Sequence, residues 1–178
     1  MVKRIGLLGM ILGMLVLLWG CGAGGVETLE TVGDVLLAPA SAAEPKYRIM
    51  VQLPKDAGFE QALSGDYEKV YTRGDGSCTY TVETLTAVSL DSLLTELTGQ
   101  ARERLTVIQT EEFDMPRYDL TWTAAGEQGE EACRAAILDD GMHYYVVTAS
   151  VPAELAGDQR QELEAMFASM GLYVDEGF

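Results

Sequence analysis

The sequence predicts an α+β domain in which an antiparallel sheet of about six or seven strands, built from hairpins, is covered by two amphipathic helices. Strand-like runs come in pairs across short turns that contain Gly, Asp or Pro. Two other segments repeat their apolar residues at helical spacing. The part of the chain that holds these patterns, residues 46–178, has the size of a single ordinary domain.

Three hairpins are expected after a first strand at residues 47–53, which ends before Pro54 because proline cannot donate to a sheet's hydrogen-bond ladder. The hairpins join residues 67–73 to 77–87 through Gly74, Asp75 and Gly76, residues 104–113 to 117–125 through Asp114, Met115 and Pro116, and residues 130–138 to 142–151 through Asp139, Asp140 and Gly141. The glycines permit the positive φ that tight hairpin turns require. Together these strands predict an antiparallel sheet.

Two helices are expected to cover this sheet. One carries an apolar stripe formed by Leu90, Leu93, Leu94 and Leu97, with Ser89 or Asp91 available as N-cap and Gly99 at its end. The other carries a stripe formed by Leu163, Met166, Phe167 and Met170, begins near Asp158 or Pro152, and ends before Gly171. Each apolar stripe needs a sheet face against which to pack.

Residues 1–20 have the organisation of a signal peptide. Lys3 and Arg4 precede an uninterrupted apolar run at 5–19, which falls short of the roughly 20 apolar residues of a comfortable transmembrane helix. The glycines at 20, 22 and 25 also satisfy the G-x-G-x-x-G pattern, with Glu44 at about the offset of its acidic partner. A dinucleotide loop needs a buried strand before it and βαβ units after it. The sequence pattern around these glycines predicts none of these elements, so no cofactor is expected.

The segment Leu18-Trp19-Gly20-Cys21 resembles the lipobox of bacterial lipoproteins. The resemblance implies that Cys21 receives a diacylglyceryl thioether and becomes the first residue of the mature chain. Trp19 departs from the family, which usually has a small residue there. Ordinary secretion and a retained anchor remain the alternatives. The A-x-A-like sites within residues 38–42 would permit secretion, but these sites lie far beyond the apolar run.

Residues 21–45 are interpreted as a lipid-anchored flexible tether, because they are rich in Gly, Ala and Pro. The chain carries 28 acidic and 12 basic residues, for a formal net charge of −16. Such a charge repels phosphate backbones and anionic headgroups, which argues against nucleic-acid binding and against a domain lying flat on a bilayer. The expected contact with the membrane is therefore the N-terminal lipid, whose two or more acyl chains would hold the protein stably.

With Cys21 used for lipid, Cys78 and Cys133 remain, each in a strand-like segment. An extracytoplasmic location permits a disulfide between them, whereas two buried free thiols are the alternative. The sequence leaves both open.

The order of strands and helices, with the run Tyr144–Ser150 leading into a helix that closes with Met166–Met170, resembles the PsbP-like fold of photosystem accessory proteins and the Mog family. The resemblance covers residues 46–175. It implies a non-enzymatic accessory or binding module that is often extracytoplasmic and sometimes lipid-anchored in bacteria. No functional residue is carried over, because no ligand-binding motif of that fold matches here.

Catalytic and metal-binding residues are not expected. His143 is the chain's single histidine and falls on a strand, so we interpret it as structural or solvent-facing. The doublets Glu111-Glu112, Glu130-Glu131 and Asp139-Asp140 suggest an acid and base pair. Neighbours on a strand point to opposite faces, however, so solvated charge is the preferred interpretation.

Aromatic residues on the predicted strands form a candidate binding surface, whose members are Tyr71, Tyr80, Trp122, Tyr144 and Tyr145. Cross-strand packing is the alternative role for these side chains. The resulting hypothesis is a lipid-anchored, extracytoplasmic module of the bacterial cell envelope without evident catalytic activity. It would bind an unidentified protein or envelope component through an open sheet face or a groove beside the helices. A hydrolase using carboxylates and a purely structural lipoprotein remain the alternatives.

Overall fold

The computed structural model describes residues 44–126 and 129–174, all within one compact unit, Ala43–Phe178. The predicted signal peptide, Cys21 and the tether up to residue 43 lie outside the described residues. Among the helices of the described ranges, none is long and apolar enough to cross a membrane.

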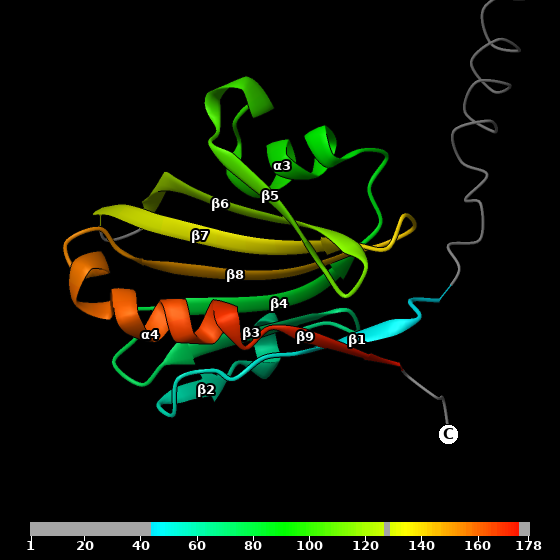
Figure 1. The fold of residues 1–178 in the computed structure, drawn as a ribbon. Helices are drawn as coiled ribbons and strands as arrows, with labels where there is room; N and C mark the ends of the chain where they lie inside the picture. Colours follow the sequence, from blue (N-terminus) through cyan, green and yellow to red (C-terminus); the bar gives the residue numbers. More distant parts are fainter. Residues whose placement is uncertain (1–43, 127–128, 175–178) are drawn as a thin grey trace, which may run out of the picture. The chain divides into compact units, whose positions relative to one another are not determined.

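Seven strands of the described chain form one antiparallel sheet, in the order β2-β3-β4-β8-β7-β6-β5 (Figure 1). Their bounds are β2 (Ala57–Phe59), β3 (Glu68–Arg73), β4 (Thr79–Leu85), β5 (Val107–Glu112), β6 (Met115–Gly126), β7 (Gly129–Asp139) and β8 (Tyr144–Pro152). The three predicted hairpins are β3–β4, β5–β6 and β7–β8. The predicted fold class, an antiparallel α+β sheet with two α-helices, is confirmed for the described residues.

A separate two-stranded ribbon pairs β1 (Tyr47–Met50) with β9 (Gly171–Val174). The first predicted strand is thus shorter than expected, and β9 and β2 are strands that the sequence pattern did not reveal. Short 3₁₀ turns, η1 (Gln61–Leu63) and η2 (Arg102–Arg104), complete the described elements.

The two α-helices pack on opposite faces of the sheet (Figure 1). α3 (Leu90–Thr98) packs its buried leucines against the face that holds Ile137 and Val146. α4 (Ala156–Ala168) packs Met166 and Phe167 against the face that holds Leu138 and Val147. Because side chains alternate along a strand, neighbouring residues of β7 and β8 supply the two separate cores.

The ends of α3 are formed as the sequence predicts. The Ser89 hydroxyl accepts a hydrogen bond from the main-chain N–H of Ser92 at 3.2 Å, and Ser92 reciprocates in a capping box. Gly99 ends the helix in the left-handed region at φ 68°, and its N–H donates to the Thr95 carbonyl at 2.8 Å. α4 starts after Leu155 without a side-chain cap.

The turn between β5 and β6 differs from the prediction. Phe113 and Asp114 are its two central residues, with φ 56° and 59°, while Met115 and Pro116 already belong to β6. Two successive residues with positive φ give the type I′ geometry that matches the twist of hairpin strands. The turn therefore places a large aromatic residue in a conformation that L-residues rarely adopt.

Cys78 and Cys133 are both buried and both free, so the disulfide considered for them is not formed. Thr79 and Cys133 each pair with Ser150 from opposite sides, so Cys78 lies just before a strand that is separated from Cys133 by β8. Two strand spacings amount to about 10 Å, which exceeds the Cα separation of about 7 Å that a disulfide spans. The alternative of two buried thiols therefore describes this structure.

Candidate functional site

The predicted aromatic binding surface is wrong for three of its five members. Tyr80 and Tyr145 are fully buried at 0% exposure, and Tyr144 is 9% exposed. Tyr145 belongs to the core under α4, whereas Tyr144 belongs to the core under α3. Since each face of the sheet carries a helix, these rings fill the two cores instead of forming one patch. Tyr71 and Trp122 are half-buried, and each packs against a different core.

The better candidate is a groove beside α4, which we name the α4 groove. It has a cavity volume of about 560 Å³. Its sheet side is lined by Thr121, Trp122, Thr123, Ala132, Cys133, Arg134, Ala149 and Val151, and its helix side by Ala156, Arg160, Leu163 and Glu164. Small-molecule sites occupy about 300–1,000 Å³, so the volume fits a ligand.

The groove exists because α4 lies along β8 and leaves β6 and β7 beside it uncovered (Figure 1). The side chains at the bottom are small, with alanine at 132, 149 and 156. Thr121 and Thr123 are exposed at the β6 side. A hollow with a largely apolar floor therefore runs between the helix and the exposed half of the sheet.

Two arginines line this groove. The Arg134 guanidinium lies over the Phe167 ring, 4.5 Å from its centroid, and its Nη2 is 3.9 Å from the nearest Asp119 carboxylate oxygen. Arg160 projects from α4 with its side chain 77% exposed and pairs with Glu164 at 3.1 Å. Because exposed pairs one helical turn apart contribute little, the charge of Arg160 remains available to a ligand.

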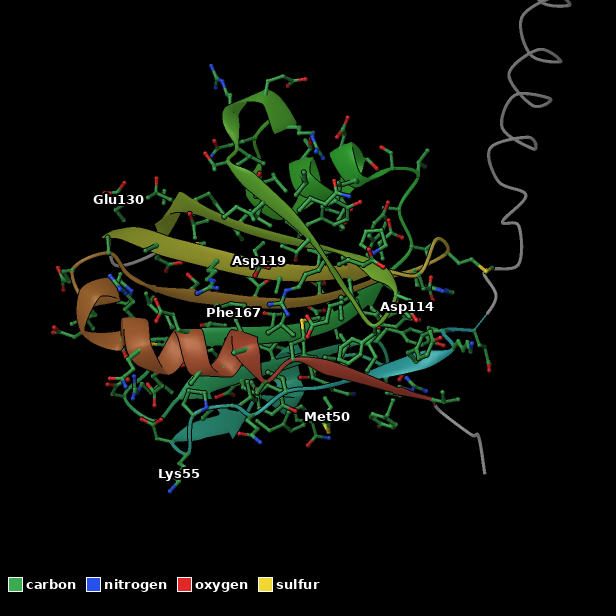
Figure 2. The ribbon with its side chains drawn as sticks, viewed as in Figure 1. Met50, Lys55, Asp114, Asp119, Glu130 and Phe167 are labelled. Carbon is green, nitrogen blue, oxygen red and sulfur yellow. The ribbon has the colours of Figure 1, made fainter. Side chains whose placement is uncertain are left out.

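Asp119 is mainly engaged by another arginine. Arg117 donates from Nε to Asp119 at 2.8 Å, and from Nη1 to Glu112. Hydrogen bonding to Asp119 is the largest cause that raises the pKa of Arg117 above its ordinary value. Asp119 and Phe167, both labelled in Figure 2, come from β6 and α4. Since the Asp119 carboxylate already pairs with Arg117, it compensates Arg134 only weakly across the longer distance.

A second hollow of about 650 Å³ lies between the β5–β6 and β7–β8 turns and the chain before β1. It gathers carboxylates from Glu44, Asp114, Asp139 and Asp140, together with His143. Within residues 44–126 and 129–174, no group of three or more His, Cys, Asp or Glu is placed to hold a metal ion.

The carboxylate of Asp140 stabilises the β7–β8 turn. It accepts hydrogen bonds from the main-chain N–H groups of Met142 and His143, at 2.8 and 2.6 Å, and from the Tyr145 hydroxyl at 2.8 Å. Burial opposes ionisation of Asp140, but these hydrogen bonds outweigh it and lower its pKa. His143 is buried, with Nδ1 3.9 Å from Asp140. A carboxylate held ionised in this way supports the turn and is poorly suited to act as a general acid.

The other acidic doublets also do not form an acid and base pair. Glu112 binds Arg117, and Glu131 accepts from the Ser150 hydroxyl. Asp139 accepts from the main-chain N–H of Gly141 at 2.8 Å. These contacts support strands and turns.

One carboxylate with unusual protonation was not singled out by the sequence. Glu83 on β4 is the Cα partner of Glu68 on β3. Burial is the largest cause that raises the pKa of Glu83 to about 7, followed by repulsion from Glu68 and Glu96. None of these three residues lines the α4 groove.

The sequence also did not single out Arg134 and Arg160. Arg134 lies between Ala132 and Ala136 on one face of its strand, so a long cation stands between two small residues. That contrast was a usable signal. Arg160 carries no comparable signal, because a basic residue on an exposed helix face is ordinary.

A scan of the chain against protein-family models finds no match, and a search of curated proteins also finds none. Among solved structures, the chain is similar to one from Bacteroides thetaiotaomicron, with 11% identity, a TM-score of 0.49 and coverage of 72% of this chain and 46% of that one. It thus spans less than half of that protein.

Two further similar structures are a cyanobacterial PsbP from Synechocystis and a Mog1 mutant. The PsbP structure has 9% identity and a TM-score of 0.49, covering 72% of this chain and 93% of that one. The Mog1 structure has 15% identity and a TM-score of 0.48, covering 69% of this chain and 89% of that one. These likenesses concern the arrangement of the backbone, and no ligand, activity or partner is carried over from them.

Proposed function

We propose that the protein is a lipid-anchored, extracytoplasmic accessory module of the bacterial envelope that binds an envelope component in the α4 groove and catalyses no reaction itself. The observation that carries the proposal is the groove, whose small-residue floor and two arginines form a ligand-sized hollow in a strongly acidic chain. The lipid attached to Cys21 would keep the module at the membrane.

The absence of catalysis is part of the proposal and is supported by how the acidic side chains are used. The carboxylates of Glu112, Glu131 and Asp140 are engaged in ion pairs and hydrogen bonds that hold strands and turns. Glu83, whose pKa is raised to about 7, faces other carboxylates. An acid and base pair would need two groups of different protonation on either side of a substrate.

The test compares the wild-type chain with a variant whose groove is filled. Thr123→Phe places an aromatic ring at an exposed β6 position that lines the groove, and Thr110→Phe makes the same change at an exposed β5 position outside it. All three full-length proteins are produced in a lipoprotein-processing bacterium, incubated with envelope extract, and analysed by native mass spectrometry.

We expect acyl mass on Cys21, and a retained extract component that Thr123→Phe loses and Thr110→Phe keeps. Equal retention by the two variants would show that the groove is not the site. A chain without acyl mass would overturn the anchoring part of the proposal. Turnover of the retained component would overturn its non-catalytic part.

A further inference from the structure

We propose that the ligand of the α4 groove is a single-chain anionic amphiphile, with its acyl chain along the groove floor and its carboxylate or phosphate bound by Arg134 and Arg160. This inference rests on the proposed function and specifies its ligand class. The α4 groove combines the two surfaces that such a molecule needs, an apolar strip and cationic groups, in one hollow.

The apolar strip is formed by alanines and larger aliphatic residues of the sheet and the helix. Half-buried Ala132 and the nearly buried Ala149 and Val151, each 1% exposed, line its sheet side, and Leu163, 9% exposed, lines its helix side. Burial of a methylene in such a setting strengthens binding by about fourfold when it is complete, and by less in an open groove. A ligand with a flexible hydrocarbon chain can follow the strip, and the volume of about 560 Å³ accommodates it.

The arginines specify the charge of the ligand. Arg134 stacks on the Phe167 ring, which restricts its side chain and shields one side of its guanidinium from water. The Asp119 carboxylate, 3.9 Å from Arg134, is already paired with Arg117 at 2.8 Å. Guanidinium groups match carboxylates and phosphates through paired N–H donors, so an anionic head is the complementary group.

Two other classes of ligand fit the groove less well. A peptide strand cannot add to its floor, because the backbone of β7 is already paired with β6 on one side and β8 on the other. A cationic amphiphile would place like charges beside Arg134 and Arg160. The chain as a whole carries 28 acidic and 12 basic residues, so its overall charge disfavours anions and the two groove arginines supply the local attraction.

The experiment varies the head of the amphiphile and keeps its chain constant. Photoreactive analogues of dodecanoate, dodecyl phosphate, dodecanol and dodecyltrimethylammonium are added to the full lipidated protein in phosphatidylcholine nanodiscs, and cross-linked residues are mapped by mass spectrometry. We expect the two anionic analogues to label the peptides of β6–β8 and α4 at least about tenfold more than the alcohol or the ammonium, as a charge-assisted hydrogen bond predicts. Preference for one anionic head will separate a fatty acid from a phosphate-headed lipid.

Arginine variants test the role of the cations. Arg160→Gln changes an exposed side chain and leaves the core untouched, so it should fold normally and lower anionic labelling several-fold. The double change with Arg134→Gln should remove the head-group preference. Arg104→Gln, which removes the same charge from exposed η2, is the matched control and should label as wild type does.

Equal labelling by dodecanol and dodecanoate, or unchanged labelling of Arg160→Gln and the double variant, would overturn the inference. If Thr123→Phe loses an envelope component while no anionic analogue labels the groove, the ligand class is wrong and the binding function stands. If Thr123→Phe changes neither extract binding nor labelling, both fail.

Discussion

Arg117 of β6 donates a hydrogen bond from Nη2 to the main-chain carbonyl oxygen of Phe167, 3.1 Å away at the last turn of α4. The same guanidinium binds Asp119 and Glu112, and its side chain is only 12% exposed. A cation at the carboxyl end of a helix also interacts favourably with the helix dipole. One largely covered arginine therefore joins the sheet to the helix that forms the wall of the α4 groove.

Replacing this arginine should loosen α4. Arg117→Met leaves two carboxylates without their counterion and a helix carbonyl without its donor, so we expect a loss of about 2–4 kcal/mol in the free energy of unfolding. Urea denaturation followed by circular dichroism measures it. Arg160→Met, which breaks an exposed pair on the same helix, should cost less than about 0.5 kcal/mol. Equal midpoints for the two variants would contradict the role assigned to Arg117.

Glu83 should make stability fall as the pH rises. Its pKa is raised from 4.5 to about 7 in the folded protein, so the folded state holds a proton that the unfolded state has already lost. Stability is therefore lost between these two pH values, and the loss is complete above about pH 7. Because water partly screens this half-buried carboxylate, Glu83→Gln should be more stable than wild type at pH 8 by about 1–2 kcal/mol, with little difference at pH 4.

Thermal unfolding of both proteins across this pH range tests the assignment. Glu111→Gln, at an exposed β5 position, is the control for the general effect of removing one negative charge. A parallel pH dependence of Glu83→Gln and wild type would show that Glu83 is ionised normally.

The β5–β6 turn should become more stable with glycine in it. Asp114, labelled at the hairpin tip in Figure 2, has φ 59°. Because glycine adopts this conformation without steric cost, Asp114→Gly should raise the free energy of unfolding by about 0.5–1 kcal/mol. Gly76→Ala, at φ 73° in the β3–β4 turn, should lower it by about 1 kcal/mol. Changes of the same sign in the two variants would refute this account of the turns.

The buried thiols of Cys78 and Cys133 should react with a thiol reagent only after unfolding. Cys78 donates to the Gln159 side-chain oxygen at 3.0 Å, and Cys133 to the Ser150 hydroxyl at 3.6 Å, with neither exposed to reagent. A thiol-specific maleimide should therefore add no mass in buffer and two adducts in denaturant under non-reducing conditions, with Cys21 blocked by its lipid. A chain that gains adducts only after reduction would contain the disulfide.

The periodic elements could be predicted from the sequence because each carries its own signal. The hairpin turns contain Gly or Asp at positions of special backbone geometry, and α3 has both of its caps. β2 and β9 have three and four residues, too few for an alternation to be recognised. β2 forms by pairing with β3, which is already in the sheet, and β9 forms by pairing with β1, which is distant in the sequence. Such strands depend on tertiary contacts.

The candidate site could be predicted only in outline. Alternation places Tyr144 and Tyr145 on opposite faces, but their exposure depends on where α3 and α4 pack, which no local pattern determines. A groove beside a helix was among the expected surfaces, yet its position requires knowing that α4 leaves part of β6 and β7 uncovered. Arg134 becomes significant only when Phe167 is seen beneath it.

The pairing of Tyr47 with Val174 places the first and last strands of the described unit side by side. The two ends of the described backbone therefore lie close together. A short linker joining residue 174 to residue 46, with new ends opened at the β3–β4 turn, would give a circular permutant that keeps the nine strands of the described residues. For the same reason, the unit is suited to insertion into a loop of another protein, since its entry and exit would occupy little more than the width of a two-stranded ribbon.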